Sequence, residues 1–225
     1  MFLSRVQIKP GPELFKIIRT DKTANGYAVH QLLWSLFPND GCKKRDFLFR
    51  EDSEGGLPRF YIVSKDMPVA NSAVAVESKQ YNPKLEGGQQ LHFTLTANPV
   101  VARKEDGKKN SVKHDVWMDA KKAAKKEDKS GPELTGICED AVKKWLVDRS
   151  EPNGFHVETD QLCVDGYFQH RFRQTKGGKE IRFSSISFEG LLTVQDPKLF
   201  VQKALFKGIG PSKAFGCGMM LVKRV

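Results

Sequence analysis

The chain has 225 residues, a size between the usual one-domain and two-domain proteins, and a formal net charge of +10 at pH 7. No stretch approaches the length of apolar sequence that a membrane span needs, and the N-terminus lacks the charged-then-apolar pattern of a signal peptide, so we expect a cytoplasmic protein. The four cysteines are scattered without C-x-x-C spacing, which argues against a zinc site and gives no support for a disulfide framework.

The positive charge is concentrated near the C-terminus. Residues 166–225 hold eleven Lys or Arg residues against three acidic ones. Such a concentration indicates a surface for a polyanion, either nucleic acid or an anionic membrane, and we favour nucleic acid. A basic face that serves only solvation is the alternative.

The first half of the sequence predicts alternating strands and helices. In order, these are a strand at residues 2–8, a helix at 26–37, strands at 47–49 and 59–64, a short helix at 68–79 and a strand at 91–100. This order of elements is that of a ferredoxin-like domain.

The second half begins with a polar segment rich in lysine, which predicts a linker that is exposed or partly disordered. A helix at residues 139–148, strands at 155–163, 167–174 and 180–194, a helix at 197–206 and a terminal strand follow. We therefore predict an α+β protein with antiparallel sheets, divided into an N-terminal domain (1–103), a lysine-rich linker (104–135) and a C-terminal domain (136–225).

A glycine-rich loop precedes the terminal strand. Its glycines, Gly208, Gly210, Gly216 and Gly218, allow positive φ and close approach of a ligand, such as a phosphate, to the backbone. The loop follows a helix and precedes a strand, whereas Walker A and dinucleotide-binding glycines follow a strand and open a helix. A turn that only returns the chain to the sheet is the alternative reading.

His30 is the first candidate for chemistry because it lies on a strongly patterned helix. Tyr27, His30 and Trp34 share a face next to an apolar stripe, and the i, i+3 spacing can present the phenol of Tyr27 and the imidazole of His30 to one small volume. That arrangement suits proton transfer at a phosphate. An aromatic interface or an edge of the core would show the same pattern.

A second candidate is the hairpin predicted around residues 176–179. Alternation places Phe168, His170 and Phe172 on one face and Gln169, Arg171 and Arg173 on the other. Aromatic and guanidinium groups together can stack bases and hold phosphates, although a simple amphipathic hairpin is an equal alternative.

Five separated segments together resemble the CasE family, the CRISPR-associated endoribonucleases of type I-E Cascade systems. The segments are residues 25–38, 45–50, 95–99, 188–192 and 208–218. The match follows the chain nearly end to end and is poorest in the lysine-rich region. The resemblance implies tandem ferredoxin-like (RRM-like) domains that bind the stem-loop of CRISPR repeat RNA and cut at the 3′ base of the stem, with no metal or other cofactor.

The resemblance also implies roles for individual residues. His30 corresponds to the catalytic histidine and Tyr27 supports it. The glycine-rich loop and the basic hairpin would hold the RNA; the residues concerned are Gly208, Gly210, Ser212, Lys213, Gly216, Gly218, Arg171, Arg173, Lys179 and Arg182. Other Cascade subunits are the expected protein partners, and no membrane is expected.

The chemistry of RNA fits these residues. Its 2′-hydroxyl can attack the adjacent phosphate once held in line, which leaves a 2′,3′-cyclic phosphate and a 5′-hydroxyl and requires only proton transfer and charge stabilisation. The sequence leaves open which of His30 and Tyr27 is the acid and which the base. A non-catalytic RNA-binding module and a structural subunit of a ribonucleoprotein are the two rival functions. Modules of the first kind usually have an RNP1-like aromatic strand, and this sequence shows none.

Overall fold

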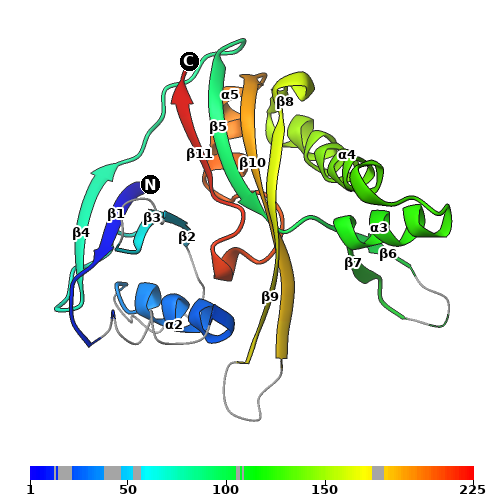
Figure 1. Ribbon diagram of the computed structural model, residues 1–225. Coiled ribbons are helices and arrows are strands. Elements are labelled where there is room, and N and C mark those ends of the chain that lie inside the picture. Colours follow the sequence, from blue (N-terminus) through cyan, green and yellow to red (C-terminus); the bar gives the residue numbers. More distant parts are fainter. Residues whose placement is uncertain are drawn as a thin grey trace.

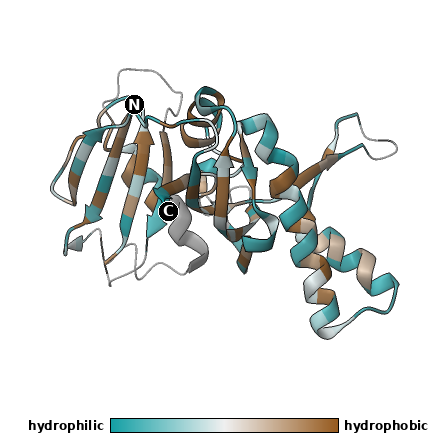
Figure 2. Cartoon of the chain, turned by 90° about the horizontal axis from the view of Figure 1, so that it is seen from above, coloured by the Kyte–Doolittle hydropathy of each residue, from teal (hydrophilic) through white to brown (hydrophobic). Residues whose placement is uncertain are grey.

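The computed structural model describes residues 1–12, 14, 22–37, 47–52, 57–104, 107, 109–173 and 180–225, with only the backbone for residues 22–27 and 172–173. Two main antiparallel sheets stand side by side, each carrying helices, so the class is α+β as predicted (Figure 1). Hydrophobic and hydrophilic residues alternate along the strands (Figure 2), as expected for sheets with one buried face. Along the described residues, no helix is long and apolar enough to cross a membrane.

The first sheet has the strand order β2-β3-β1-β4 with all neighbours antiparallel. Its elements are β1 (Phe2–Ile8), α2 (Lys22–Trp34), β2 (Phe47–Asp52), β3 (Arg59–Ser64) and β4 (Val74–Gln80). The apolar stripe of α2 packs on the sheet, since Val29 and Leu33 are buried in one cluster with Val6, Phe60 and Ile62. This is the ferredoxin-like order without its second helix.

The prediction of a helix at residues 68–79 was wrong. Residues 65–73 contain no helix, and β4 pairs along the whole of β1 from Gln80 to Val74. The physical reason is the edge of β1, whose backbone groups require a partner, together with Val74 and Val76, which favour a strand. The polar residues at 77–80 are exposed, so they give no helical period that a sequence can distinguish from an edge strand.

The second sheet has the order β11-β5-β10-β8, and β9 continues along β10 beyond β8. Its elements are β5 (Gln90–Ala97), α4 (Gly131–Ser150), β8 (Phe155–Val157), β9 (Cys163–Arg173), β10 (Glu180–Val194), α5 (Pro197–Leu199), a π-helical turn (Phe200–Leu205) and β11 (Met220–Arg224). Its core includes Phe93 and Phe188 on the strands and Val142 and Trp145 on α4. This sheet has the full ferredoxin-like arrangement, so the chain has the tandem fold.

The two sheets divide the chain between β4 and β5, not after residue 103. The strand predicted to complete the first sheet, β5, lies instead between β10 and β11. The strand predicted at 155–163 is also split, because a 3-10 turn at Thr159–Gln161 separates β8 from β9.

The lysine-rich segment is largely folded rather than a linker. A short β-ribbon pairs β6 (Val100–Arg103) with β7 (Val112–Asp115), α3 (Val116–Lys126) follows, and α4 begins at Gly131. Ala124 of α3 is buried, whereas the neighbouring Lys125 and Lys126 are exposed. The lysines therefore form the solvated face of an amphipathic helix, a pattern that charge alone could not distinguish from a linker.

The β9–β10 hairpin links the two halves. It extends beyond the second sheet and lies alongside α2 of the first (Figure 1). The 3-10 turn Lys213–Phe215 of the glycine-rich loop contacts both α2 and β2. The elements that carry the predicted functional residues therefore meet at the junction of the two sheets.

Candidate RNA-cleavage site

His30 lies at this junction. Its neighbours Val29 and Leu33 are buried in the first core, and this register of α2 leaves the imidazole half-buried and directed toward the glycine-rich loop. The imidazole centroid lies 5.6 Å from the ring of Trp34 and 6.2 Å from the ring of Phe215. The structure thus brings together the histidine and the loop that the sequence predicted, although they lie far apart in the chain.

Tyr27 occupies α2 one turn before His30. Its side chain lies outside the described residues, so the expected pairing of phenol and imidazole stays a prediction.

The glycine-rich loop folds back on itself. Ile209 N donates a hydrogen bond of 2.9 Å to Gly218 O, and Gly218 N donates one of 2.7 Å to Thr96 O on β5. Gly208 and Gly218 have φ of 74° and 90°. A Cβ at Gly208 would lie 2.6 Å from Gly218 O, and a Cβ at Gly218 would lie 2.7 Å from Ile209 O. The glycines are therefore required by the loop's own backbone.

The middle of the loop is held by Ser212, a non-glycine residue with φ of 57°. Asn98 Nδ2 donates a hydrogen bond of 2.7 Å to Ser212 Oγ, and Phe215 N donates one of 2.9 Å to Ser212 O. These two bonds fix the turn that carries Lys213 and Phe215. Lys213 lines a groove together with Lys65 and Lys207, so three lysines border this groove.

Aromatic contacts continue from the loop onto the hairpin. The ring of Phe215 stacks on Phe183 of β10 at 5.3 Å, and Phe183 stacks on His170 of β9 at 4.5 Å. His170 Nε2 lies 2.7 Å from Ser185 Oγ, and burial lowers the pKa of His170 below its ordinary value of 6.5. We call these five side chains, Trp34, His30, Phe215, Phe183 and His170, the aromatic row.

The other face of the hairpin is basic. Arg171 and Arg182 lie opposite each other in the register, and Glu180 accepts hydrogen bonds from both guanidinium groups. These bonds, that from Arg171 first, hold the pKa of Glu180 below its ordinary value. The side chains of Arg171 and Arg182 remain 63% and 65% exposed, so both can reach a polyanion. Only the backbone of Arg173 is described, and Lys179 lies outside the described residues.

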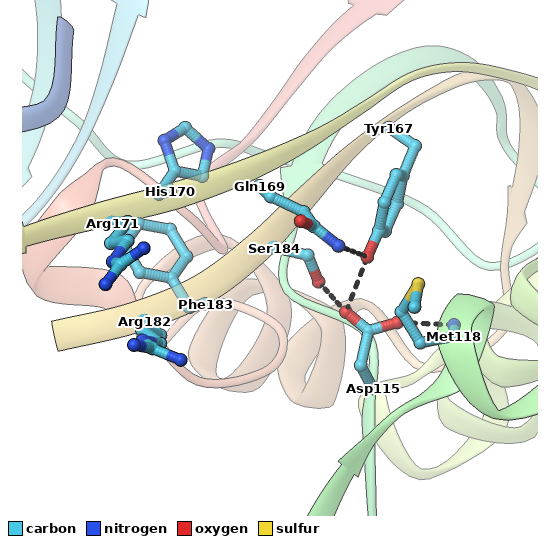
Figure 3. Close-up of a pocket in the computed structure, with 9 residues that line it drawn as sticks. All are labelled: Asp115, Met118, Tyr167, Gln169, His170, Arg171, Arg182, Phe183 and Ser184. Carbon is cyan, nitrogen blue, oxygen red and sulfur yellow. Dashed lines mark hydrogen bonds between the residues drawn. The ribbon is translucent and has the colours of Figure 1, made fainter.

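A pocket opens on this basic face of the hairpin, beside α3 (Figure 3). At its inner end, Asp115 Oδ2 accepts hydrogen bonds from Tyr167 at 3.3 Å and from Ser184. Asp115 Oδ1 caps α3 by accepting a bond of 2.8 Å from Met118 N. In the view of Figure 3, Arg171 and Arg182 lie at the opposite end of the pocket. Asp115 therefore connects the lysine-rich segment, which contains β7 and α3, to the hairpin by hydrogen bonds.

Sequence reasoning missed several of these residues. Phe183 lies in a strand whose alternation was visible, but its partners come from β9 and the distant loop. Asp115 could have been found as an N-cap, since an aspartate directly precedes the helical segment at residues 116–126. Glu180 gave no signal, because a lone acid in a basic hairpin does not reveal which arginines it holds.

Within the described part of the chain, no group of three or more His, Cys, Asp or Glu side chains is arranged to hold a metal ion. The arrangement instead offers an imidazole, a tightly turned loop and exposed cationic groups. An imidazole can transfer protons near neutral pH, and cationic groups can hold phosphates. Proton-transfer chemistry on a bound polyanion is what these residues can perform.

The sequence of this chain is similar to those of known proteins. The family described as "CRISPR associated protein" matches residues 1–224. The chain is 30% identical over 197 residues to the CRISPR system Cascade subunit CasE of Escherichia coli (strain K12), covering 86% of this chain and 89% of that protein. It is 27% identical over 238 residues to the CRISPR-associated endoribonuclease Cse3 of Thermus thermophilus, covering 99% of both.

A solved structure shares the fold. The CRISPR endoribonuclease Cse3 bound to a 19-nt RNA superimposes with a TM-score of 0.70 over 99% of this chain and 100% of that chain, at 23% identity.

Proposed function

Because the chain belongs to the CRISPR-associated protein family, we propose that it is a metal-independent endoribonuclease that processes CRISPR repeat RNA. It binds the stem-loop of the repeat and cuts at the 3′ base of the stem. The names of its relatives, a Cascade subunit and a CRISPR-associated endoribonuclease, support both the activity and the assembly.

One observation carries the proposal within this chain. The imidazole of His30 contacts Phe215 of the glycine-rich loop, and Phe215 in turn contacts the hairpin that carries Arg171 and Arg182. A proton-transfer group and a turned loop therefore meet at the junction of the two sheets, and the hairpin that packs against them carries two arginines on its opposite face. Cleavage of a bound phosphodiester requires such a group close to an element that can hold the RNA.

The proposed reaction is attack by a 2′-hydroxyl on the adjacent phosphorus. The hydroxyl loses its proton, the new O–P bond closes a 2′,3′-cyclic phosphate, and the bond to the 5′-oxygen breaks as that oxygen gains a proton. His30 and Tyr27 supply these proton transfers, in an order that the geometry leaves open. His30 in its charged form also stabilises the developing negative charge on the phosphate.

RNA binding is proposed to involve two surfaces. Arg171 and Arg182, with Arg173 and Lys179 nearby in the hairpin sequence, contact phosphates of the stem, whose deep major groove is poorly read by side chains. Lys213, Ser212 and the four glycines hold the RNA at the loop. The amines of Lys65 and Lys207 in the same groove support this assignment.

The protein is proposed to act in the cytoplasm, to need no cofactor, and to join other Cascade subunits. A second candidate function, a structural subunit that retains the RNA without cutting it, is favoured by the name of the relative from Escherichia coli. The two functions are compatible, because an enzyme that keeps its product also serves as a subunit.

The first experiment is cleavage of a stem-loop CRISPR repeat RNA in EDTA, beside the same RNA with a 2′-deoxy substitution at the expected cut. We expect the first RNA to be cut and the second to survive. His30→Ala should lower the single-turnover rate by about 10²-fold or more while leaving the RNA dissociation constant within about 3-fold. Tight binding without cleavage by the unsubstituted protein would refute the catalytic proposal and favour the structural one.

A further inference from the structure

The aromatic row joins three segments that are distant in the chain. Trp34 and His30 come from α2, Phe215 from the glycine-rich loop, and Phe183 and His170 from the two strands of the hairpin. Successive ring centroids along the row lie between 4.5 and 6.2 Å apart. These are the distances at which aromatic pairs attract one another in preferred orientations.

Trp34, at one end of the row, packs against the core of the first sheet. Among the described residues, three clusters of buried hydrophobic side chains form the cores, and neither Phe183 nor Phe215 is a member of them. Both rings are only partly buried. Phenylalanines outside the cores contribute less to stability than buried ones do. The contacts of Phe183 and Phe215 therefore indicate a role other than stabilising a core.

The backbone on both sides of Phe215 is fixed. Ser212 is held by Asn98, and Ser212 O accepts the hydrogen bond from Phe215 N. Gly216 has φ of 81°, and a Cβ there would lie 3.3 Å from the ring of Phe49. The ring of Phe215 is therefore presented from a rigid turn, with Phe183 stacked on one side and the imidazole of His30 on another.

We propose that Phe215 is a positioning residue for catalysis, which holds the imidazole of His30 in a fixed place relative to the RNA-binding hairpin, with Phe183 supporting it from the hairpin side. The inference rests on the proposed endoribonuclease function. Removal of the Phe215 ring takes away one contact that restricts the rotamers of the imidazole, and a displacement of about 1 Å at a reacting group costs about 10²-fold in rate. The row also ties the catalytic helix to the element that binds the stem.

The test substitutes Phe215→Leu, which keeps an apolar side chain but removes the ring. At saturating repeat RNA, we expect the single-turnover cleavage rate to fall about 10-fold or more, with the dissociation constant within about 2-fold. Phe215→Tyr, which restores a ring, should recover the rate to within about 3-fold. Phe183→Leu should cause a smaller loss of the same kind, and it replaces Phe215→Leu if that variant does not fold.

Tyr81→Leu is the matched control. Tyr81 is partly buried and packs edge-on against Phe206 at 5.8 Å, between two of the cores and apart from the aromatic row. Tyr81→Leu therefore loses the aromatic pair with Phe206, whereas Phe215→Leu loses the pairs with His30 and Phe183, and Tyr81→Leu should cleave at the unsubstituted rate. Equal losses in Tyr81→Leu and Phe215→Leu would mean that only stability is at stake and would overturn the proposal.

Nuclear magnetic resonance of the free protein gives a readout that does not depend on activity. The imidazole resonances of His30 should shift in Phe215→Leu, whereas those of the exposed His156 on β8 should not. Unchanged His30 resonances, or an unchanged cleavage rate, would overturn the proposal. If the unsubstituted protein cleaved no repeat RNA, the proposed function would fail, and the His30 resonances would still decide whether Phe215 fixes the imidazole.

Discussion

Gly208 and Gly218 both lie so close to neighbouring backbone that neither position has room for a side chain. Each has a positive φ, and the Cβ contacts that would arise are to backbone oxygens, which cannot rotate away. Ser212 adopts a left-handed conformation without being glycine, at a cost that its hydrogen bonds with Asn98 and Phe215 offset. The shape of the loop thus depends on the close backbone contacts at these glycines and on the hydrogen bonds of Ser212.

Gly208→Ala should lower the free energy of unfolding by about 3 kcal/mol, because it adds both left-handed strain and a clash. Gly88→Ala is the matched control. Gly88 also has φ of 81°, but a Cβ there would meet nothing within 4 Å, so only about 1 kcal/mol of strain is expected. Urea unfolding of both variants measures the difference, and equal losses would show that the contact with Gly218 is immaterial.

His170 should make stability depend on pH. Because burial lowers its pKa in the folded state, the unfolded chain takes up a proton first as the pH falls through about 6.5. The folded state binds fewer protons in this window, so the free energy of unfolding should decrease between about pH 7.5 and 5.5. His170→Phe keeps a ring against Phe183 and removes the titrating group. Its melting temperature should fall less over this range, and a parallel fall in both proteins would contradict the assignment.

At the scale of elements, the β9–β10 hairpin has two faces with different contacts. The alternation visible in the sequence predicted that His170 and Arg171 lie on opposite faces; in the structure His170 stacks on the cross-strand Phe183, and Arg171 lies opposite Arg182 in the register. What each face meets could not be predicted, because the glycine-rich loop on one side and Asp115 on the other are distant in the chain. Glu180 accepts hydrogen bonds from both arginines, whose side chains stay exposed.

Arg171→Gln combined with Arg182→Gln should weaken the binding of repeat RNA. Each lost phosphate contact should reduce the slope of log affinity against log salt concentration by about 1, so a double variant loses about 2. Arg5→Gln serves as the control, because Arg5 is also exposed and paired with one glutamate, Glu77, but lies on β1. Titrations at several salt concentrations distinguish the two variants. An unchanged slope in the hairpin variant would remove these arginines from the RNA interface.

At the scale of the whole molecule, local patterns predicted most of the helices and strands and the ferredoxin-like topology. They did not predict where along the chain the first sheet ends and the second begins. β5 alternates like any strand, and nothing within it indicates that its partners are β10 and β11 rather than β1. The helix α3 was not predicted, because its buried side is narrow and its lysines resemble those of an exposed linker. His30 and the glycine-rich loop were both predicted as candidates, whereas their contact through Phe215 depends on how the two sheets are joined.

The tie between the loop and β5 also has a consequence for synthesis on the ribosome. α2 is made early, yet the turn that completes the surroundings of His30 needs Gly218 bonded to Thr96 and Ser212 bonded to Asn98. Those bonds cannot form until residues near the C-terminal end of this chain have emerged. A nascent chain that has emerged only as far as α2 therefore lacks the turn that holds Phe215 against the imidazole of His30, and translation delays this contact until residues 212–218 have left the ribosome.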